Sequence, residues 1–273
     1  MYVSIYDSCV LLAVQVLAAC EEPANIALTH LSLPTDRWRC FENGDGKLSF
    51  PLLQTSQMRL EREILQSKQH DVMAPGQTGF FHWSTSVRDE ADPIPGRHNK
   101  AFPLIEAEGM GTIHDLYQHV SDLYGHFNFP ADPVLLSYKD ACAHLKVNDI
   151  GAAEELELWK KFGSLIFLHS FPVHETFFNM EDNPNGTVRK MDVIACGAET
   201  NGCGERSTNP TRMYEKFFQQ SGGEYAKRLF GIAGRKRVMQ ELDDYLALPM
   251  IPRWGYGMGG TRFIRALMLE KVL

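Results

Sequence analysis

This 273-residue sequence lacks closely spaced cysteine pairs, basic residues near its N-terminus and long apolar runs. Its six cysteines include no C-x-x-C pair, which favours reduced thiols over a disulfide framework or a zinc site. No lysine or arginine precedes Arg37, so the apolar stretch near the N-terminus lacks the positive start of a secretory signal, and it is short for a membrane span. We therefore expect a cytoplasmic protein in which residues 4–21 form a helix, buried or at a subunit interface.

The sequence also has few basic clusters and no sign of internal division. Its formal net charge is −7 and no long run is rich in lysine or arginine, so extensive nonspecific binding to nucleic acid is not favoured. The composition does not exclude a local basic groove. Linkers, repeats and low-complexity segments are absent, and an apolar content of 44% is ordinary for a globular chain. The sequence predicts one domain over residues 1–273.

Aromatic and β-branched stretches alternate with helical patterns along the chain. Two strands at 78–90 and 101–111, joined by a Pro- and Gly-containing loop at 91–99, predict an antiparallel hairpin. Two buried strands are expected at 164–172 and 190–200. Helices are expected at 56–69, 112–127, 137–147, 151–163, 211–220 and 224–248. Antiparallel strands with flanking helices predict an α+β fold, mainly an antiparallel sheet.

The stretch GYGMGG at 255–260 has the spacing of a dinucleotide-binding fingerprint. That fingerprint needs a helix and then a second strand with an acidic residue about 20 residues on, whereas residues 261–273 can form one helix only. We therefore expect a Gly-rich strand that runs into a single terminal helix. Close-set glycines let a flat group lie against the backbone, and Arg262 could grip a phosphate or stack on a base. The simpler alternative is a strand-to-helix turn with packed glycines.

Charged residues gather at two other places. Two arginines, a histidine and an aromatic residue flank the hairpin loop, which suits a polyphosphate and a purine. Further on, Asp192, Glu199 and Arg206 follow one another at intervals of seven: the two acids suit Mg²⁺ carried by a nucleotide, and the arginine suits a carboxylate. Taken singly, each residue also has a structural interpretation, such as a loop histidine, a core phenylalanine or a salt bridge.

Taken in order, these elements resemble the catalytic core of class II aminoacyl-tRNA synthetases, in the aspartate/asparagine/lysine subgroup. The likeness covers roughly residues 50–273. Motif 2 of that family corresponds to Arg88, Glu90, Arg97, His98, Phe102 and Glu106. Motif 3 corresponds to Gly255, Gly257, Gly259 and Arg262, and the segment between the two motifs to Asp192, Gly197, Glu199 and Arg206. TSQMRLE, with Gln57 and Glu61, is similar to an element of the asparaginyl branch, and FPVHETFFNM to the strand before the metal segment.

The sequence departs from the family pattern in three respects. RHNKAF holds one more residue than the usual R-H-x-E-F, and Lys100 stands where an acid is expected. Motif 1 is not clear: LSLP around Pro34 is its candidate remnant, and residues 4–21 its candidate dimer helix. The chain leaves no room for an N-terminal anticodon-binding barrel, which needs on the order of 100 residues. The chain therefore looks like a free-standing asparaginyl/aspartyl-tRNA synthetase paralogue, such as an ammonia-dependent asparagine synthetase.

The resemblance implies a role for each matched residue in making an aminoacyl-adenylate from ATP. Arg88 would hold the α-phosphate and the reacting carboxylate, and Arg97 and His98 would bend the γ-phosphate back. Phe102 and Arg262 would sandwich the adenine above Gly257 and Gly259, and Arg262 would also reach the γ-phosphate. Arg88 and Arg262 are the implied catalytic residues, and Glu90 belongs to the implied ATP-binding residues. Asp192 and Glu199 would hold Mg²⁺. Gln57 and Glu106 would bind the α-ammonium group of the amino acid, and Arg206 a substrate carboxylate.

The resemblance leaves the acceptor of the activated amino acid open. The missing barrel and the acidic charge favour a small-molecule ligase that activates aspartate or a close analogue and transfers it to ammonia or a small amine. A truncated enzyme that aminoacylates tRNA, a carrier or a protein is the alternative, and an inactive regulatory paralogue is the second alternative. In each case the resemblance implies a homodimer, and no membrane partner is expected.

Overall fold

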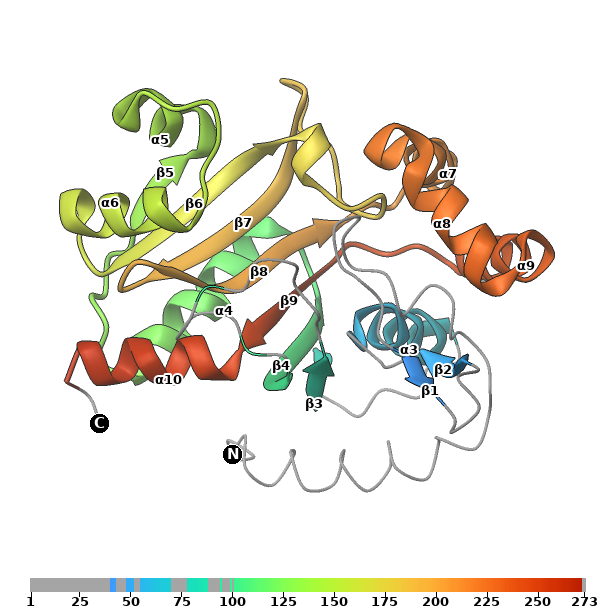
Figure 1. The fold of residues 1–273 in the computed structure, drawn as a ribbon, viewed down its shortest axis with the longest axis horizontal. Helices are drawn as coiled ribbons and strands as arrows, with labels where there is room; N and C mark the ends of the chain where they lie inside the picture. Colours follow the sequence, from blue (N-terminus) through green and yellow to red (C-terminus); the bar gives the residue numbers. More distant parts are fainter. Residues whose placement is uncertain are drawn as a thin grey trace.

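The computed structural model describes residues 40–42, 48–51, 55–69, 78–87, 94, 99 and 101–271. Its centre is a seven-stranded sheet in the order β3-β4-β9-β8-β7-β6-β5 (Figure 1). All neighbours in this sheet are antiparallel except β5 and β6. The strands are β3 (Gly79–Val87), β4 (Ala101–Met110), β5 (Val134–Ser137), β6 (Leu165–Pro172), β7 (Thr187–Ala195), β8 (Ala198–Arg206) and β9 (Arg253–Gly259), with β1 (Cys40–Glu42) and β2 (Leu48–Pro51) in a separate pair.

Helices pack on both faces and at one end of the sheet (Figure 1). Helices α4 (Ile113–His126) and α10 (Gly260–Leu269) cover one face. Helix α3 (Gln57–Gln69) packs against β3, β4 and β9. Helices α5 (Tyr138–Leu145) and α6 (Ala152–Phe162) pack at the β5–β6 end of the sheet. A helical insertion between β8 and β9 consists of α7 (Pro210–Gln219), α8 (Glu224–Ala233) and α9 (Arg235–Leu246). Two short 3₁₀ turns also lie among the described residues, at Val173–Glu175 and Gln220–Gly223.

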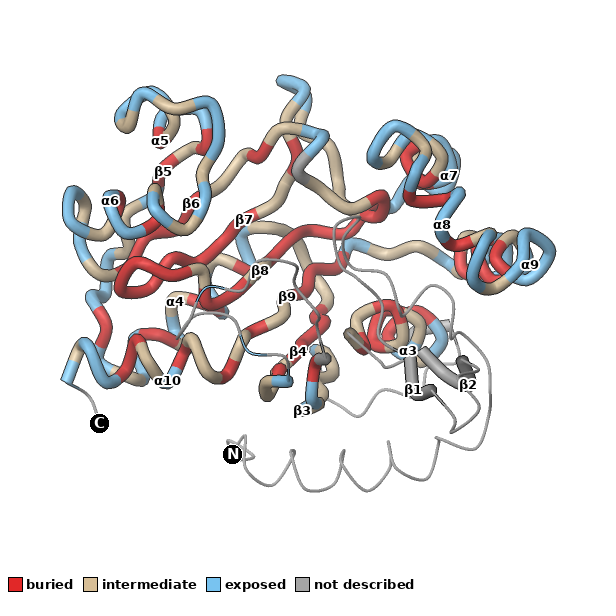
Figure 2. The backbone as a smooth tube through the Cα atoms, viewed as in Figure 1, coloured by how far each residue is buried: buried red, intermediate tan, exposed pale blue. Residues whose placement is uncertain are grey.

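The main core lies between the sheet and helices α4 and α10. Leu116, Val120 and Tyr124 are four residues apart in α4, so they form one apolar stripe, and all three are fully buried against the sheet. Figure 2 shows the same division along the chain, with β7, β8 and β9 mostly buried and the outer sides of the helices exposed. On the opposite face, a second apolar cluster lies between α5, α6 and strands β5 to β7, and polar residues occupy the middle of the sheet.

The sequence predicted most of these elements correctly, including the 78–111 hairpin and the final strand and helix. The single strand expected at 190–200 is wrong: β7 ends at Ala195 and β8 begins at Ala198. The turn between them places Cys196 and Gly197 at positive φ (48° and 76°), a conformation that favours glycine. The single helix expected at 224–248 is also two, α8 and α9, because Gly234 interrupts it at φ 81°. Strand β5 was not predicted.

Several sequence expectations lie outside the described residues. They are the helix at 4–21, the motif 1 remnant around Pro34 and most of the hairpin loop at 91–99. Within the described ranges, no helix has both the length and the apolar character needed to cross a membrane.

Candidate active site

Glycines of two adjacent strands form a flat floor on the polar face of the sheet. Gly202 of β8 lies opposite Gly257 of β9, and Gly204 lies opposite Gly255. Gly259 continues the row at the end of β9. Because residues two apart on a strand share a face, all five glycines lie on the same side of the sheet. The floor consists of these residues: Gly202, Gly204, Gly255, Gly257 and Gly259.

Charged side chains edge this floor on both flanking strands. On β4, Glu106 lies opposite Gly257 and Glu108 opposite Gly255. On β7, Asp192 lies opposite Gly202 and Lys190 opposite Gly204. The sheet register therefore brings two acids of β4 and an acid and a lysine of β7 to the two sides of a strip with no side chains.

The floor is open at one end and filled at the other. A Cβ placed on Gly257 would meet its nearest atom at 3.7 Å, and one on Gly259 at 3.9 Å, which are ordinary contacts. A Cβ on Gly255 would overlap the carboxylate of Glu108, and one on Gly204 would lie 3.3 Å from the Met180 methyl group. The open end therefore has room for a flat ligand, whereas protein side chains already lie over the other end.

Two predicted metal ligands converge on the open end. A Cβ placed on Gly202 would lie 3.2 Å from Glu199 Oε1 and 3.7 Å from Asp192 Oδ1. Asp192 Oδ1 is buried and has no hydrogen-bond partner among the described residues. Burial raises the pKa of Asp192 to about 7, Lys190 opposes this shift and Glu199 adds to it.

These residues fit a divalent cation that arrives with a nucleotide. No group of three or more His, Cys, Asp or Glu ligands gathers in the part of the chain that the structure describes. Mg²⁺ commonly binds through one or two carboxylates together with substrate phosphates and water. An unpartnered carboxylate oxygen beside a second carboxylate is that kind of donor set, and the assignment of Asp192 and Glu199 to a metal stays a prediction.

Arg262 begins helix α10 next to these acids. Its Nη1 donates a 3.0 Å hydrogen bond to the Glu199 carbonyl and lies 3.6 Å from Glu199 Oε2. Phe102 is half-buried near the start of β4, where the hairpin enters the loop. The remaining motif 2 residues, Arg88, Glu90, Arg97 and His98, lie outside the described residues. The structure thus brings Asp192, Glu199 and Arg262 together at the open end.

Glu106 is held by the segment that leads into α3. Its Oε2 accepts a 2.7 Å hydrogen bond from the Ser56 amide, and its Oε1 accepts one from the Thr55 hydroxyl. The Ser56 hydroxyl in turn contacts His82 Nδ1 at 2.8 Å. An ionised carboxylate has about four lone-pair sites, so Glu106 can still accept from a substrate ammonium group. Its predicted role is compatible with this geometry.

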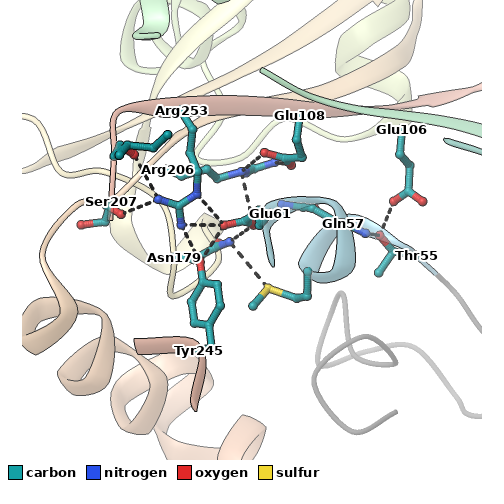
Figure 3. A network of polar contacts seen from close by, with 12 residues as sticks. Thr55, Gln57, Glu61, Glu106, Glu108, Asn179, Arg206, Ser207, Tyr245 and Arg253 are labelled. Carbon is teal, nitrogen blue, oxygen red and sulfur yellow. Dashed lines mark hydrogen bonds and ion pairs between the residues drawn. The ribbon is translucent and has the colours of Figure 1, made fainter. Parts of the chain in front are cut away.

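Arg206 lies in a buried network of charges at the filled end (Figure 3). Its guanidinium donates to both oxygens of Glu108, at 2.6 and 3.3 Å, and lies 3.5 Å from Glu61 of α3. When the Gln57 amide is oriented with its oxygen towards Arg206, it accepts hydrogen bonds of 2.9 and 2.6 Å from this arginine. Arg206 was predicted from sequence to bind a substrate carboxylate, and in the structure it already has two carboxylate neighbours.

Glu61 links this pair to a second arginine. Arg253 Nη2 lies 2.8 Å from Glu61 Oε2, the Tyr245 hydroxyl donates to the same oxygen at 2.6 Å, and Asn179 donates to Oε1 at 2.5 Å. Both arginines and both glutamates are at most 2% exposed. We call these four residues the buried tetrad: Glu61, Glu108, Arg206 and Arg253.

Two acids and two bases make the buried tetrad neutral when all four are charged. Burial raises the pKa of Glu108 to about 8, against the opposing pull of Arg206. When Glu108 takes up a proton, the tetrad gains one positive charge beside the floor. The charge that a ligand meets at this end therefore depends on the protonation of Glu108.

The sequence did not assign Lys190, Glu108, Arg253, Tyr245 or Asn179 to the site. Three of them had a usable signal, because strand alternation places each on the face of an assigned neighbour. Glu108 lies two residues after Glu106, Arg253 two residues before Gly255, and Lys190 two residues before Asp192. Tyr245 and Asn179 gave no such signal, because their elements reach the site only through the fold.

Comparison with known proteins supports the fold assignment. No protein-family model and no curated protein sequence matches the chain. The asparaginyl-tRNA synthetase of Pyrococcus horikoshii, solved with asparaginyl-adenylate, superposes with a TM-score of 0.67 at 19% identity, over 96% of this chain and 64% of that one. The asparaginyl-tRNA synthetase of Entamoeba histolytica, also solved with asparaginyl-adenylate, has a TM-score of 0.65 at 20% identity, and the match covers 90% of this chain and 61% of that one. The aspartyl-tRNA synthetase of the same organism has a TM-score of 0.62 at 15% identity, and the match covers 97% of this chain and 54% of that one.

The fold is therefore that of the class II aminoacyl-tRNA synthetase catalytic domain, with a mixed, mostly antiparallel seven-stranded sheet. The chain spans less than two thirds of the length of these synthetase chains. At such low identities the likeness establishes the fold, and the activity must be argued from the site.

Proposed function

We propose that this chain is an AMP-forming ligase: it adenylates a small amino acid with ATP and releases pyrophosphate. The observation that carries the proposal is the glycine floor, open between Asp192, Glu199 and Arg262 at one end and bounded by the buried tetrad at the other. Two solved proteins with this fold carry asparaginyl-adenylate, the class of product that such a floor would hold.

The proposed reaction needs charge placement and no protein nucleophile. A carboxylate oxygen of the amino acid attacks the α-phosphorus of ATP, and the bond from that phosphorus to the bridging oxygen breaks, so pyrophosphate leaves with the electron pair. Arg262, together with Arg88 of motif 2, would neutralise charge on the phosphates, and Gly257 and Gly259 would support the adenosine. Orientation and fixed charge are the two largest contributions available to such a site.

Asp192 and Glu199 would hold Mg²⁺, which when bound supplies positive charge to the phosphate oxygens. Glu106, with Gln57 nearby, would hold the α-ammonium group and direct the carboxylate towards the open end of the floor. The assignments of Arg97, His98, Glu90 and Phe102 to ATP stay predictions from motif 2.

The side chain of the amino acid would lie against Arg206 and Glu108. Aspartate suits this site when Glu108 is protonated, because the buried tetrad then carries one unbalanced positive charge. Asparagine is a second candidate, favoured by the Arg206–Glu108 pair itself: the arginine would donate to the amide oxygen, and an ionised Glu108 would accept from the amide nitrogen.

For the acceptor, we propose ammonia or a small amine, which would give an asparagine synthetase-like amide product. Transfer to tRNA, a carrier or a protein is the alternative, and an inactive regulatory paralogue is the second. The acidic overall charge disfavours a long phosphate-binding surface, since binding to nucleic acid depends on many basic contacts. A homodimer and a cytoplasmic location also stay proposals.

The test is ATP–pyrophosphate exchange with aspartate, asparagine and the other amino acids. We expect exchange with one of the first two, and loss of about 10²–10³-fold in Arg262→Ala. Arg265→Ala is the matched control, because Arg265 lies on the same helix and donates to the Cys196 carbonyl. Cleavage of ATP to ADP and phosphate would contradict adenylation. Product analysis with ammonia, small amines and total tRNA then identifies the acceptor.

A further inference from the structure

Lys190 places a fixed positive charge directly on a proposed metal ligand. It lies two residues before Asp192 on β7, so both side chains project from the same face of the sheet. Its Nζ lies 2.8 Å from Asp192 Oδ2, and only 17% and 12% of the two side chains are exposed. The same ammonium group lies 3.7 Å from the ring centroid of Phe171, a buried residue of β6. A carboxylate and an aromatic ring therefore both hold the lysine in place.

The pairing divides the two oxygens of Asp192. Oδ2 is occupied by Lys190, whereas the buried Oδ1 has no hydrogen-bond partner among the described residues and approaches the same point above Gly202 as Glu199 Oε1. Such an arrangement leaves one oxygen for a cation while the lysine cancels the charge of the carboxylate.

Two cations oppose the two carboxylates at this point. Asp192 and Glu199 contribute two negative charges, Lys190 contributes one positive charge at 2.8 Å from the first, and Arg262 contributes another at 3.6 Å from the second. The two cations weaken the attraction that these carboxylates, with the nearby buried acid Glu155, offer to a free divalent cation. A nucleotide brings several negative charges of its own, so the same two carboxylate oxygens can complete the coordination of a cation that the phosphates already hold.

We propose that Lys190 is a built-in counter-ion that makes metal binding at Asp192 and Glu199 depend on the nucleotide. The inference rests on the proposed ATP-dependent function. Lys190 is a positioning residue: it holds the Asp192 carboxylate so that Oδ1 faces the floor, and it keeps the site from filling with metal alone.

The experiment measures Mn²⁺ binding by electron paramagnetic resonance, without nucleotide and with α,β-methylene ATP, whose α–β bridge the reaction cannot break. Mn²⁺ is a suitable probe because it shares the oxygen ligands of Mg²⁺. Lys190→Gln removes the charge and can still donate a hydrogen bond to Oδ2, and Lys190→Met is a second variant should the first misfold. Lys227→Gln, at an exposed lysine of α8, changes the net charge equally and is the matched control.

We expect Mn²⁺ to bind the wild type only with the nucleotide analogue. Lys190→Gln should gain nucleotide-free affinity by about tenfold or more, as expected when a neighbouring unit charge is removed from a partly buried carboxylate. Lys190→Arg and Lys227→Gln should behave like the wild type, and adding Asp192→Asn to Lys190→Gln should abolish the gain.

Two results would overturn the inference. If Lys190→Gln and the wild type bind Mn²⁺ equally without nucleotide, Lys190 is not a counter-ion, although the proposed function stands when the wild type binds Mn²⁺ with the analogue. If neither protein binds Mn²⁺ in either condition, Asp192 and Glu199 are not a metal site, and the metal assignment fails together with the inference.

Discussion

The two ends of the glycine floor use charge in opposite ways. At the filled end, Glu61 accepts from Asn179, Tyr245 and Arg253, and both oxygens of Glu108 accept from Arg206. At the open end, Asp192 has a buried oxygen without a partner among the described residues, and more than a third of the Glu199 side chain is exposed. The filled end therefore satisfies its charges within the protein, whereas the open end keeps some of them available for a ligand.

This difference indicates a division of labour within one surface. Buried, mutually bonded charges are costly to disturb, so they are suited to defining the shape and net charge of a small pocket. Charges that keep an oxygen without a hydrogen-bond partner, such as Asp192 Oδ1, are suited to a ligand that brings its own phosphates. Three further predictions test the comparison, beginning with the largest expected effect.

Replacing Glu61 should break the filled end most severely. Glu61→Ala would leave Arg206 and Arg253 buried with Glu108 as their only acidic partner among the described residues. An uncompensated buried charge typically costs about 3–5 kcal/mol, and arginine cannot release its proton to avoid the cost. Urea unfolding should show a loss of this size. Glu63→Ala, on the exposed side of the same helix, should lose less than about 1 kcal/mol, and equal losses in the two variants would contradict the assigned role of the tetrad.

Two glycine substitutions should separate the ends of the floor. Gly255→Ala would force the Glu108 carboxylate away from Arg206, because the added Cβ overlaps it, and overpacking of this kind costs about 1–3 kcal/mol. Gly257→Ala makes only ordinary contacts, so its free energy of unfolding should stay near that of the wild type while binding of ATP weakens. Urea unfolding and calorimetric titration with ATP would check both variants. Equal destabilisation by the two would show that the floor has no open end.

The smallest effect concerns pH and the choice of substrate. Below its raised pKa of about 8, Glu108 is neutral, and Arg206 can donate hydrogen bonds to the side-chain carboxylate of aspartate. Above this pKa, the ionised Glu108 repels that carboxylate and favours the side-chain amide of asparagine. The kcat/KM ratio of aspartate to asparagine in pyrophosphate exchange should therefore fall by up to about tenfold per pH unit above pH 8. Glu108→Gln should remove this dependence. A wild-type ratio that stays constant from pH 6.5 to 9.5 would refute the role given to Glu108.

The sequence by itself determined much of the sheet and the order of the site elements. Aromatic and β-branched residues around a Pro- and Gly-containing loop predicted the 78–111 hairpin, and close-set glycines followed by apolar residues at helical spacing predicted the final strand and helix. These signals act between near neighbours in the chain. The interval of seven between Asp192 and Glu199 also indicated a pair of acids, which the turn at Cys196–Gly197 brings together although a single strand was expected there.

Only the tertiary structure decided which charges are available to a ligand. Glu61 and Arg253 are 192 positions apart and meet because α3 packs against β9, the strand that carries Arg253. The sequence predicts that Arg206 binds a substrate carboxylate. Its pairing with Glu108 follows from the register of β4, β9 and β8. Lys190 is likewise held beside Asp192 by a contact with the ring of Phe171 on the next strand. The reason is physical: the residue type sets the charge that a side chain can carry, whereas burial and distant partners decide whether that charge is already balanced.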